Sequence, residues 1–199
     1  MNKFGNFYKI EEFGFEKGKP VRRRLQMLDH IFYSDKDSGK KYDVLDIGCA
    51  EAMVGKLYGE HFNSYDGVDQ NSERLVTADK VLNKYITCPY SLKNFDFSTK
   101  SGLEEFDTEK NLNQYDVVLY LEVQHHILKR AQPHIKNAMR QKVLSYLLNM
   151  SSDWFAIRTF FSGDKDSFKN INEHGFDLYF EEPFIAEDQG DGFIFRKRK

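Results

Sequence analysis

Short apolar runs alternate along the chain with longer segments in which apolar residues recur every three or four positions. Four runs rich in β-branched and aromatic residues have the length of buried strands: residues 43–47, 65–68, 116–121 and 154–158. Each run is separated from the next by a segment with helical potential. This alternation predicts an α/β fold with a parallel sheet.

The clearest predicted helix covers residues 133–150. Pro133 suits its first turn, and four apolar residues repeat at four-residue steps on one face: Ile135, Met139, Val143 and Leu147. A second predicted helix covers residues 72–85, with Ser72 as a possible N-cap. Both helices are expected to pack on the sheet.

The C-terminal part of the chain has a different pattern. A third predicted helix lies between residues 164 and 175, where Gly175 could close it. Residues 176–180 and 192–195 are aromatic, strand-like runs separated by a loop without helical periodicity. They predict two antiparallel strands at the end of a parallel sheet.

The length of 199 residues suits a single domain, residues 1–199. Residues 42–199 would form its core, and residues 1–41 an N-terminal helical flank or lid. Within that flank three apolar residues are spaced for a helix: Leu25, Leu28 and Phe32. We expect this segment mainly to cover the core.

Composition narrows the function classes. The net charge of −2 provides no field that would attract a DNA duplex, and the basic runs at residues 22–24 and 196–199 are typical of solvated surfaces. Only Cys49 and Cys88 occur, without metal-type spacing, which favours a reducing interior. No segment resembles a membrane span or a secretion signal, so we expect a cytoplasmic protein without membrane contact.

Candidate chemistry begins where the first strand ends. An apolar run ends in Asp46 and turns through Gly48, Cys49 and Ala50 into a predicted helix. The next strand ends in Asp69, where a carboxylate can accept both hydroxyls of a ribose. In open α/β sheets ligands bind beyond the carboxyl ends of the strands, so two acids there predict a cofactor site.

These residues resemble the class I S-adenosylmethionine-dependent methyltransferases. The family pattern, acid-x-Gly-x-Gly-x-Gly, is here Asp-Ile-Gly-Cys-Ala-Glu-Ala at residues 46–52. The resemblance continues through Gly-Val-Asp at 67–69, Asp-Phe at 96–97 and Tyr-Asp-Val-Val-Leu at 115–119. It implies a Rossmann-like, seven-stranded, mostly parallel sheet with helices on both faces and an antiparallel C-terminal strand.

The resemblance also implies roles for individual residues. Asp46 and the backbone around Gly48 would hold the methionine part of S-adenosylmethionine, and Asp69 the ribose. Asp96 would face the adenine amino group and Phe97 its ring. Cys49, Ala50 and Gln70 complete the implied cofactor-binding set.

The chain departs from the family pattern at two positions: Ala50 and Ala52 stand where the pattern has its second and third glycines. Alanine fits such positions where φ stays negative, and its presence could weaken cofactor affinity.

Other interpretations of these residues stay open. Gly48 could be a simple turn, Asp46 a helix cap and Asp69 a solvated loop acid. A dinucleotide-binding domain would instead carry G-x-G-x-x-G without an acid two places before the first glycine.

A second polar group, Glu122, His125 and His126, follows the fourth strand. An imidazole there could act as a base or bind the acceptor, with Glu122 orienting it. A metal would need three or four ligands, and only His134 lies near, so no metal is expected.

The sequence therefore predicts an S-adenosylmethionine-dependent methyltransferase. No Asn-Pro-Pro-Tyr run, which the resembled DNA and protein amide methylases usually carry, follows the fourth strand, so a small molecule or RNA is the expected acceptor. The alternative is a non-catalytic module that keeps the fold and binds a partner. The sequence does not indicate an oligomeric state.

Overall fold

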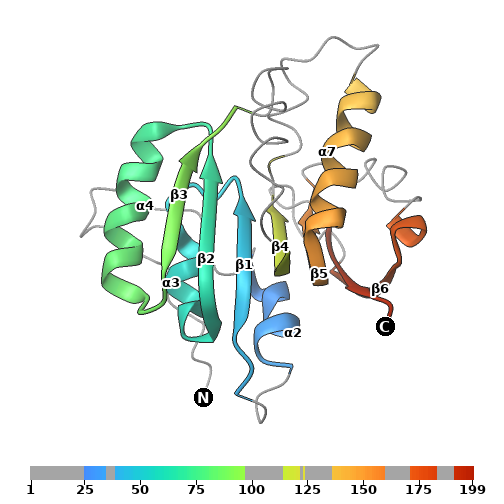
Figure 1. Ribbon diagram of the computed structural model, residues 1–199, viewed down its shortest axis with the longest axis horizontal. Coiled ribbons are helices and arrows are strands. Elements are labelled where there is room, and N and C mark those ends of the chain that lie inside the picture. The colour runs from blue at the N-terminus through green and yellow to red at the C-terminus, as the bar shows by residue number, and fades with distance from the viewer. Residues whose placement is uncertain are drawn as a thin grey trace.

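The computed structural model describes residues 25–34, 39–96, 114–121, 123, 136–159, 171–182 and 191–199. Its centre is a seven-stranded sheet in the order β3-β2-β1-β4-β5-β7-β6 (Figure 1). The strands are β1 (Tyr42–Ile47), β2 (Phe62–Asp69), β3 (Tyr90–Asn94), β4 (Tyr115–Leu121), β5 (Ser151–Arg158), β6 (Phe176–Glu182) and β7 (Gly192–Lys197).

The strand directions match the predicted mixed sheet. β1 pairs in parallel with both β2 and β4, and the parallel pairing continues to β3 on one side and β5 on the other. β7 is antiparallel to its two neighbours, β5 and β6. The predicted antiparallel C-terminal pair is therefore confirmed.

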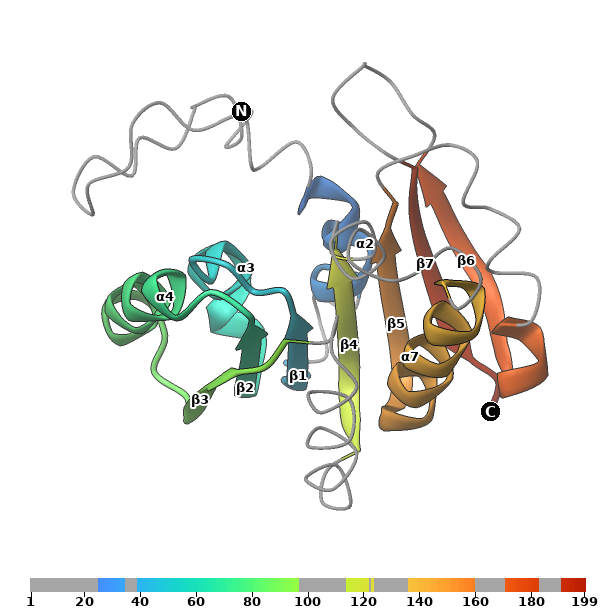
Figure 2. The ribbon, with the colours of Figure 1, turned by 90° about the horizontal axis from the view of Figure 1, so that it is seen from above.

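Helices cover both faces of the sheet. η2 (Gln26–Leu28), α2 (Asp29–Phe32), α3 (Met53–Tyr58) and α4 (Ser72–Tyr85) contribute to one apolar cluster, and α7 (Lys136–Met150) to the other (Figure 2). Two short 3₁₀ turns, η3 (Gly59–His61) and η6 (Ile171–His174), precede β2 and β6. This arrangement of layers is the predicted Rossmann-like fold.

The predicted strands and the predicted helix at residues 72–85 are confirmed with small changes of their bounds. The helix predicted at residues 133–150 is described from Lys136 as α7, and its predicted first turn, residues 133–135, lies outside the described residues. Residues 164–170 of the third predicted helix also lie outside the described residues. The helix at residues 72–85 has the predicted limits, but its N-cap is Asn71 and not Ser72. The Asn71 side chain accepts the N–H groups of Glu73 and Arg74 at 2.9 and 3.2 Å, whereas Ser72 is already helical. Of the segment ending at residue 175, residues 171–174 form a 3₁₀ turn, which Gly175 follows with φ +82°.

The described part of the N-terminal flank packs on the sheet. Leu25, Leu28 and Phe32 are buried in the same apolar cluster as Trp154 of β5. The periodicity therefore identified the inward-facing side chains. These described residues of the flank contribute to the core.

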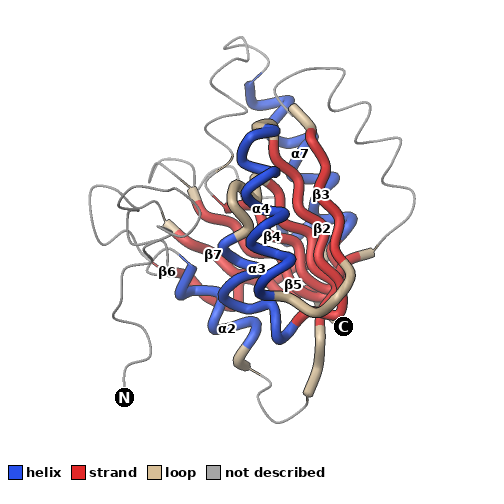
Figure 3. The backbone as a smooth tube through the Cα atoms, turned by 90° about the vertical axis from the view of Figure 1, so that its left-hand side faces the viewer, coloured by secondary structure: helices blue, strands red, loops and turns tan. Residues whose placement is uncertain are grey.

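The winding of the chain changes direction between β1 and β4. From β1 the chain proceeds through β2 to β3 at one edge of the sheet, and β4 and β5 follow on the other side of β1 (Figure 1). Figure 3 views the molecule from the side of α4 and β3. In open α/β sheets a crevice forms at such a point, outside the carboxyl ends of the strands. The residues that follow β1, β2 and β4 are therefore at the expected position of a ligand site.

Among the described residues, no helix is both long enough and apolar enough to cross a membrane.

Candidate cofactor site

The loop after β1 is attached to the end of β2. The N–H groups of Gly48 and Cys49 both donate to the carbonyl of Val68, at 2.7 and 3.1 Å. The Cys49 N–H thus shares an acceptor with its neighbour, and the chain turns away from the sheet at this point. Ala52 then donates to the carbonyl of Cys49 at 2.8 Å and precedes α3.

Three residues of this loop adopt left-handed backbone conformations. Gly48 has φ +77°, and Ala50 and Ala52 have φ +50° and +54°. The condition under which alanine would fit without strain, a negative φ, is therefore not met at either alanine. The loop keeps a conformation that favours glycine, and each alanine is strained by roughly 1–2 kcal/mol in it.

Gly48 also allows a close approach by the chain that leaves β4. A Cβ placed on Gly48 would lie 2.1 Å from Cγ2 of Val123. Val123 is partly buried and packs against the apolar cluster that includes α7. Val123, the described residue that follows β4, therefore contacts the loop after β1.

Asp69 connects the end of β2 to this loop. Its side chain is only 8% exposed, so it is not a solvated loop acid. Oδ2 accepts the N–H of Ala50 at 3.0 Å, and Oδ1 accepts the N–H of Asn71 at 2.8 Å. Each carboxylate oxygen has two lone pairs, so each can still accept a hydroxyl group.

Asp46 is buried within the sheet below the loop, with 2% of its surface exposed. Its Oδ2 accepts a hydrogen bond of 2.7 Å from the hydroxyl of Tyr65 on β2. Burial raises the pKa of Asp46 to about 7; the hydrogen bond from Tyr65 opposes this change, and the charge of Asp69 adds to it. Asp46 does not cap a helix, since α3 begins after Ala52 without a side-chain cap.

Cys49 lies next to these acids and is buried. Burial, followed by the charges of Asp46 and Asp69, raises the pKa of its thiol. The thiol is therefore a neutral, apolar part of the site wall. Gly67 provides the space for it, because a Cβ on Gly67 would lie 3.0 Å from the Cys49 sulfur.

The end of β3 lies beside Asp69. The Asn94 side chain and the N–H of Phe95 donate to the Asp69 carbonyl, at 3.0 and 3.2 Å. Asp96, two residues beyond β3, is partly buried, and Gln70 is exposed at the start of the turn after β2. Both therefore follow strand ends at the same edge as Asp46 and Asp69. Phe97 lies outside the described residues.

The predicted acceptor-side residues Glu122, His125 and His126 lie outside the described residues. Their neighbour Val123 is described, and it contacts the loop after β1. Within the described ranges, no group of three or more His, Cys, Asp and Glu side chains could hold a metal ion.

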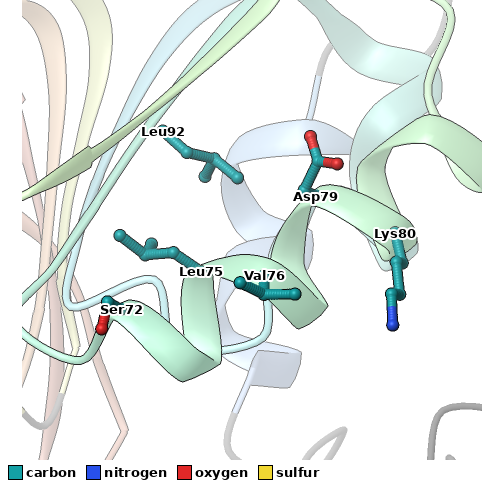
Figure 4. A pocket seen from close by; sticks show the side chains of 6 residues that line it. All are labelled: Ser72, Leu75, Val76, Asp79, Lys80 and Leu92. Atoms are coloured by element: carbon teal, nitrogen blue, oxygen red, sulfur yellow. The ribbon is translucent and has the colours of Figure 1, made fainter.

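An open groove lies beside the predicted site, between α4 and β3 (Figure 4). Its lining is mainly apolar and includes the exposed side chain of Val76. None of its residues belongs to the predicted cofactor set: Ser72, Leu75, Val76, Asp79, Lys80 and Leu92. The groove and the Asp46–Asp69 cluster are therefore separate features.

Two residues that contribute to this site, Tyr65 and Asn71, were not predicted from the sequence. Tyr65 belongs to a strand run that is typical of core packing, so nothing marked its hydroxyl as a partner of Asp46. One clue to its role was available, because Tyr65 lies four residues before Asp69 on the same strand, so the two side chains share a face of the sheet. Asn71 directly precedes a predicted helix and is a preferred N-cap residue, so its position could have been found.

Several solved structures that share this fold are methyltransferases. Magnesium protoporphyrin IX methyltransferase from Synechocystis with bound S-adenosylhomocysteine aligns with a TM-score of 0.65 at 12% identity, covering 94% of this chain and 91% of that chain. The N-methyltransferase NodS from Bradyrhizobium japonicum aligns with a TM-score of 0.65 at 13% identity, covering 90% and 88%. A proposed RNA methyltransferase from Pyrococcus horikoshii gives a TM-score of 0.60 at 14% identity, covering 98% and 91%.

No protein-family model and no curated protein sequence matches the chain. The structural likeness nonetheless extends over nearly the whole chain. The protein therefore has the fold of the class I S-adenosylmethionine-dependent methyltransferases, which confirms the fold that the sequence motifs implied.

Proposed function

We propose that this protein binds S-adenosylmethionine at the carboxyl ends of β1 and β2 and transfers its methyl group to a small molecule or RNA. The observation that carries the proposal is the pair of buried carboxylates, Asp46 and Asp69, around a tight glycine turn at the switch point of the sheet. Burying two like charges in one site is unfavourable unless hydrogen bonds, protonation or an opposite charge compensates for it, and a ligand can supply part of that compensation. A cofactor with an ammonium group and two ribose hydroxyls offers such compensation.

The described residues fit this cofactor. Asp69 retains acceptor capacity on both oxygens for the ribose hydroxyls, while its bonds to Ala50 and Asn71 keep it in place. Asp46 and the backbone of Gly48, Cys49 and Ala50 would hold the methionine part, which carries the ammonium group. Asp96, Phe97 and Gln70 would contact the adenosine part.

The cofactor supplies a methyl group already activated by its sulfonium, so the protein has mainly to align the acceptor behind that carbon. Orientation of this kind can contribute on the order of 7–11 kcal/mol to the lowering of the barrier. Glu122, His125 and His126 follow β4, and we assign them to the acceptor side. A histidine base would increase the rate of methyl transfer by about 10²- to 10⁴-fold for an acceptor that must lose a proton.

Two classes of acceptor fit the fold. The similar structures include a porphyrin methyltransferase and a proposed RNA methyltransferase. The net charge of −2 favours a small molecule, whereas the basic residues 196–199 at the chain end could touch RNA phosphates. The free thiols of Cys49 and Cys88 fit a reducing compartment such as the cytoplasm.

The competing function is a non-catalytic module that binds a partner protein. The observation favouring it is the strained loop, since Ala50 and Ala52 occupy left-handed positions that glycine fills in the family pattern. Such a loop could hold the cofactor less closely than a glycine loop would.

Methyl-labelled S-adenosylmethionine separates these two functions. The purified protein is incubated with the label and with the small-molecule and RNA fractions of a cell extract in separate reactions. An enzyme transfers the label to one fraction and produces S-adenosylhomocysteine in step with it. If neither fraction receives the label and the protein also fails to bind the cofactor, the proposed function is contradicted and the non-catalytic module is supported.

A further inference from the structure

Asp46 and Tyr65 form a buried pair that the resemblance to methyltransferases does not account for. The two side chains come from neighbouring strands, β1 and β2, and both are almost fully buried. The Tyr65 hydroxyl donates to Oδ2 of Asp46 at 2.7 Å. Because both strands are central to the sheet, this oxygen of Asp46 is held in a fixed position.

The electrostatic surroundings of this pair are mainly acidic. The described titratable groups that interact with Asp46 are Tyr65, Asp69 and Cys49, and no described cation is among them. Burial and Asp69 favour the protonated form of Asp46, while the hydrogen bond from Tyr65 favours the ionised form. The Tyr65 hydroxyl is therefore the described group that opposes protonation of this carboxyl.

We propose that Tyr65 is a positioning residue for cofactor capture: its hydroxyl fixes Oδ2 of Asp46 and favours the ionised form of the carboxyl, which the ligand's ammonium group requires. Capture of the cofactor is then coupled to release of a proton from Asp46. This inference rests on the proposed function, because it assigns the methionine part of the ligand to Asp46.

The direction of the pH dependence follows from the pKa of Asp46, which is about 7 in the ligand-free protein. Below that pH the carboxyl is neutral and attracts an ammonium group weakly. Affinity for S-adenosylhomocysteine should therefore rise as the pH increases through 7. Replacing Tyr65 by Phe removes the group that lowers this pKa, so the rise should move to higher pH.

The test compares S-adenosylhomocysteine with 5′-methylthioadenosine, which has the adenosine part without the ammonium group. In Tyr65→Phe, affinity for S-adenosylhomocysteine at pH 7 should fall by about 3- to 10-fold and recover toward the wild-type value at higher pH, since one pKa unit corresponds to a factor of ten. Affinity for 5′-methylthioadenosine should change little with pH or with the substitution.

Tyr58→Phe is the matched control. Tyr58 is also a buried tyrosine, and its single O–H proton lies within hydrogen-bond distance of two acceptors, Oδ1 of Asp29 at 2.8 Å and the carbonyl of Leu25 at 3.0 Å. It lies outside the predicted cofactor set. Its replacement should leave the pH profile of S-adenosylhomocysteine binding at the wild-type position.

If Tyr65→Phe does not fold, a measurement on the wild-type protein still tests the inference. Titration calorimetry at pH 7 in two buffers of different ionisation enthalpy should show release of about half a proton per S-adenosylhomocysteine bound, as expected for a carboxyl with a pKa near 7. Binding without proton release, or an unshifted profile in a folded Tyr65→Phe, would overturn the inference alone. Failure of the wild-type protein to bind S-adenosylhomocysteine at any pH would instead overturn the proposed function.

Discussion

The carboxylate of Asp69 holds the loop after β1 through the backbone of Ala50, with 3.0 Å between Oδ2 and the amide nitrogen. Its other oxygen accepts the N–H of Asn71, which caps α4. One side chain thus fixes the positions of the loop, the end of β2 and the start of α4. The residue proposed to bind the ribose is therefore also a structural residue.

Replacing Asp69 by Ala should affect both ligand affinity and stability. The variant removes the acceptor for the ribose hydroxyls, and affinity for S-adenosylhomocysteine should fall by roughly 1–3 kcal/mol. It also leaves two backbone N–H groups without their carboxylate, so the free energy of unfolding should fall measurably. Calorimetry and urea denaturation test these effects separately; unchanged affinity in a folded variant would remove Asp69 from the site.

Ala50→Gly should stabilise the protein. Ala50 has φ +50° and is only partly buried, so glycine relieves the strain without leaving a core cavity. The net gain, after the larger unfolded-state entropy of glycine, should be about 0.5–1 kcal/mol in urea denaturation. A loss of stability would mean that φ at this residue is not positive.

Two glycine substitutions separate backbone strain from steric overlap. Gly39 has φ +60° with no atom within 4 Å of an added Cβ, so Gly39→Ala should lower stability only through its backbone conformation. Gly48→Ala adds a clash with Val123 and should be more destabilising by about 1–3 kcal/mol. Equal losses in the two variants would place Val123 away from the loop.

Arg158, which is buried, and Glu182, which is partly buried, form an ion pair between the ends of β5 and β6. Glu182→Gln removes the negative charge beside a guanidinium group whose side chain is 3% exposed but keeps an acceptor oxygen, and should reduce stability by about 1–3 kcal/mol. The matched control, Asp177→Asn, removes an exposed partner of Arg198 and should change stability little. Similar small changes in both variants would show that the Arg158 pair is well solvated.

The acceptor-side assignment is tested with His125→Ala and His126→Ala. Both variants should bind S-adenosylhomocysteine with near wild-type affinity, because they follow β4 and not the strands that carry the cofactor acids. If one histidine is the base, its variant should lose about 10²-fold or more in turnover and the acid limb of its pH profile. Loss of cofactor affinity with normal turnover at saturation would contradict the assignment.

Most of the fold could be predicted from the spacing of apolar residues and from the residue types at the ends of the predicted strands. The limits of α4 were predictable because its apolar spacing is regular between a strong cap and the turn before Pro89. The order of β7 and β6 was not predictable from their own residues, because it depends on pairing between distant segments.

The chemistry of the site was predictable only in part. Asp46 and Asp69 stood out because they end consecutive strands, but the bond between Asp46 and Tyr65 depends on the register of β1 against β2. The positive φ of Ala50 and Ala52 was not visible either, since alanine does not by itself indicate a left-handed conformation.

Titration calorimetry of the wild-type protein with S-adenosylhomocysteine, with NAD as the comparison ligand, tests the central proposal most directly. Saturable binding of S-adenosylhomocysteine with one site per chain is expected, together with a higher Tm in its presence, because a ligand selective for the folded state stabilises it. NAD should not bind, because the loop after β1 lacks the glycines of a dinucleotide site. No heat and no change in Tm at millimolar S-adenosylhomocysteine, or equal binding of NAD, would contradict the assignment of this site to S-adenosylmethionine.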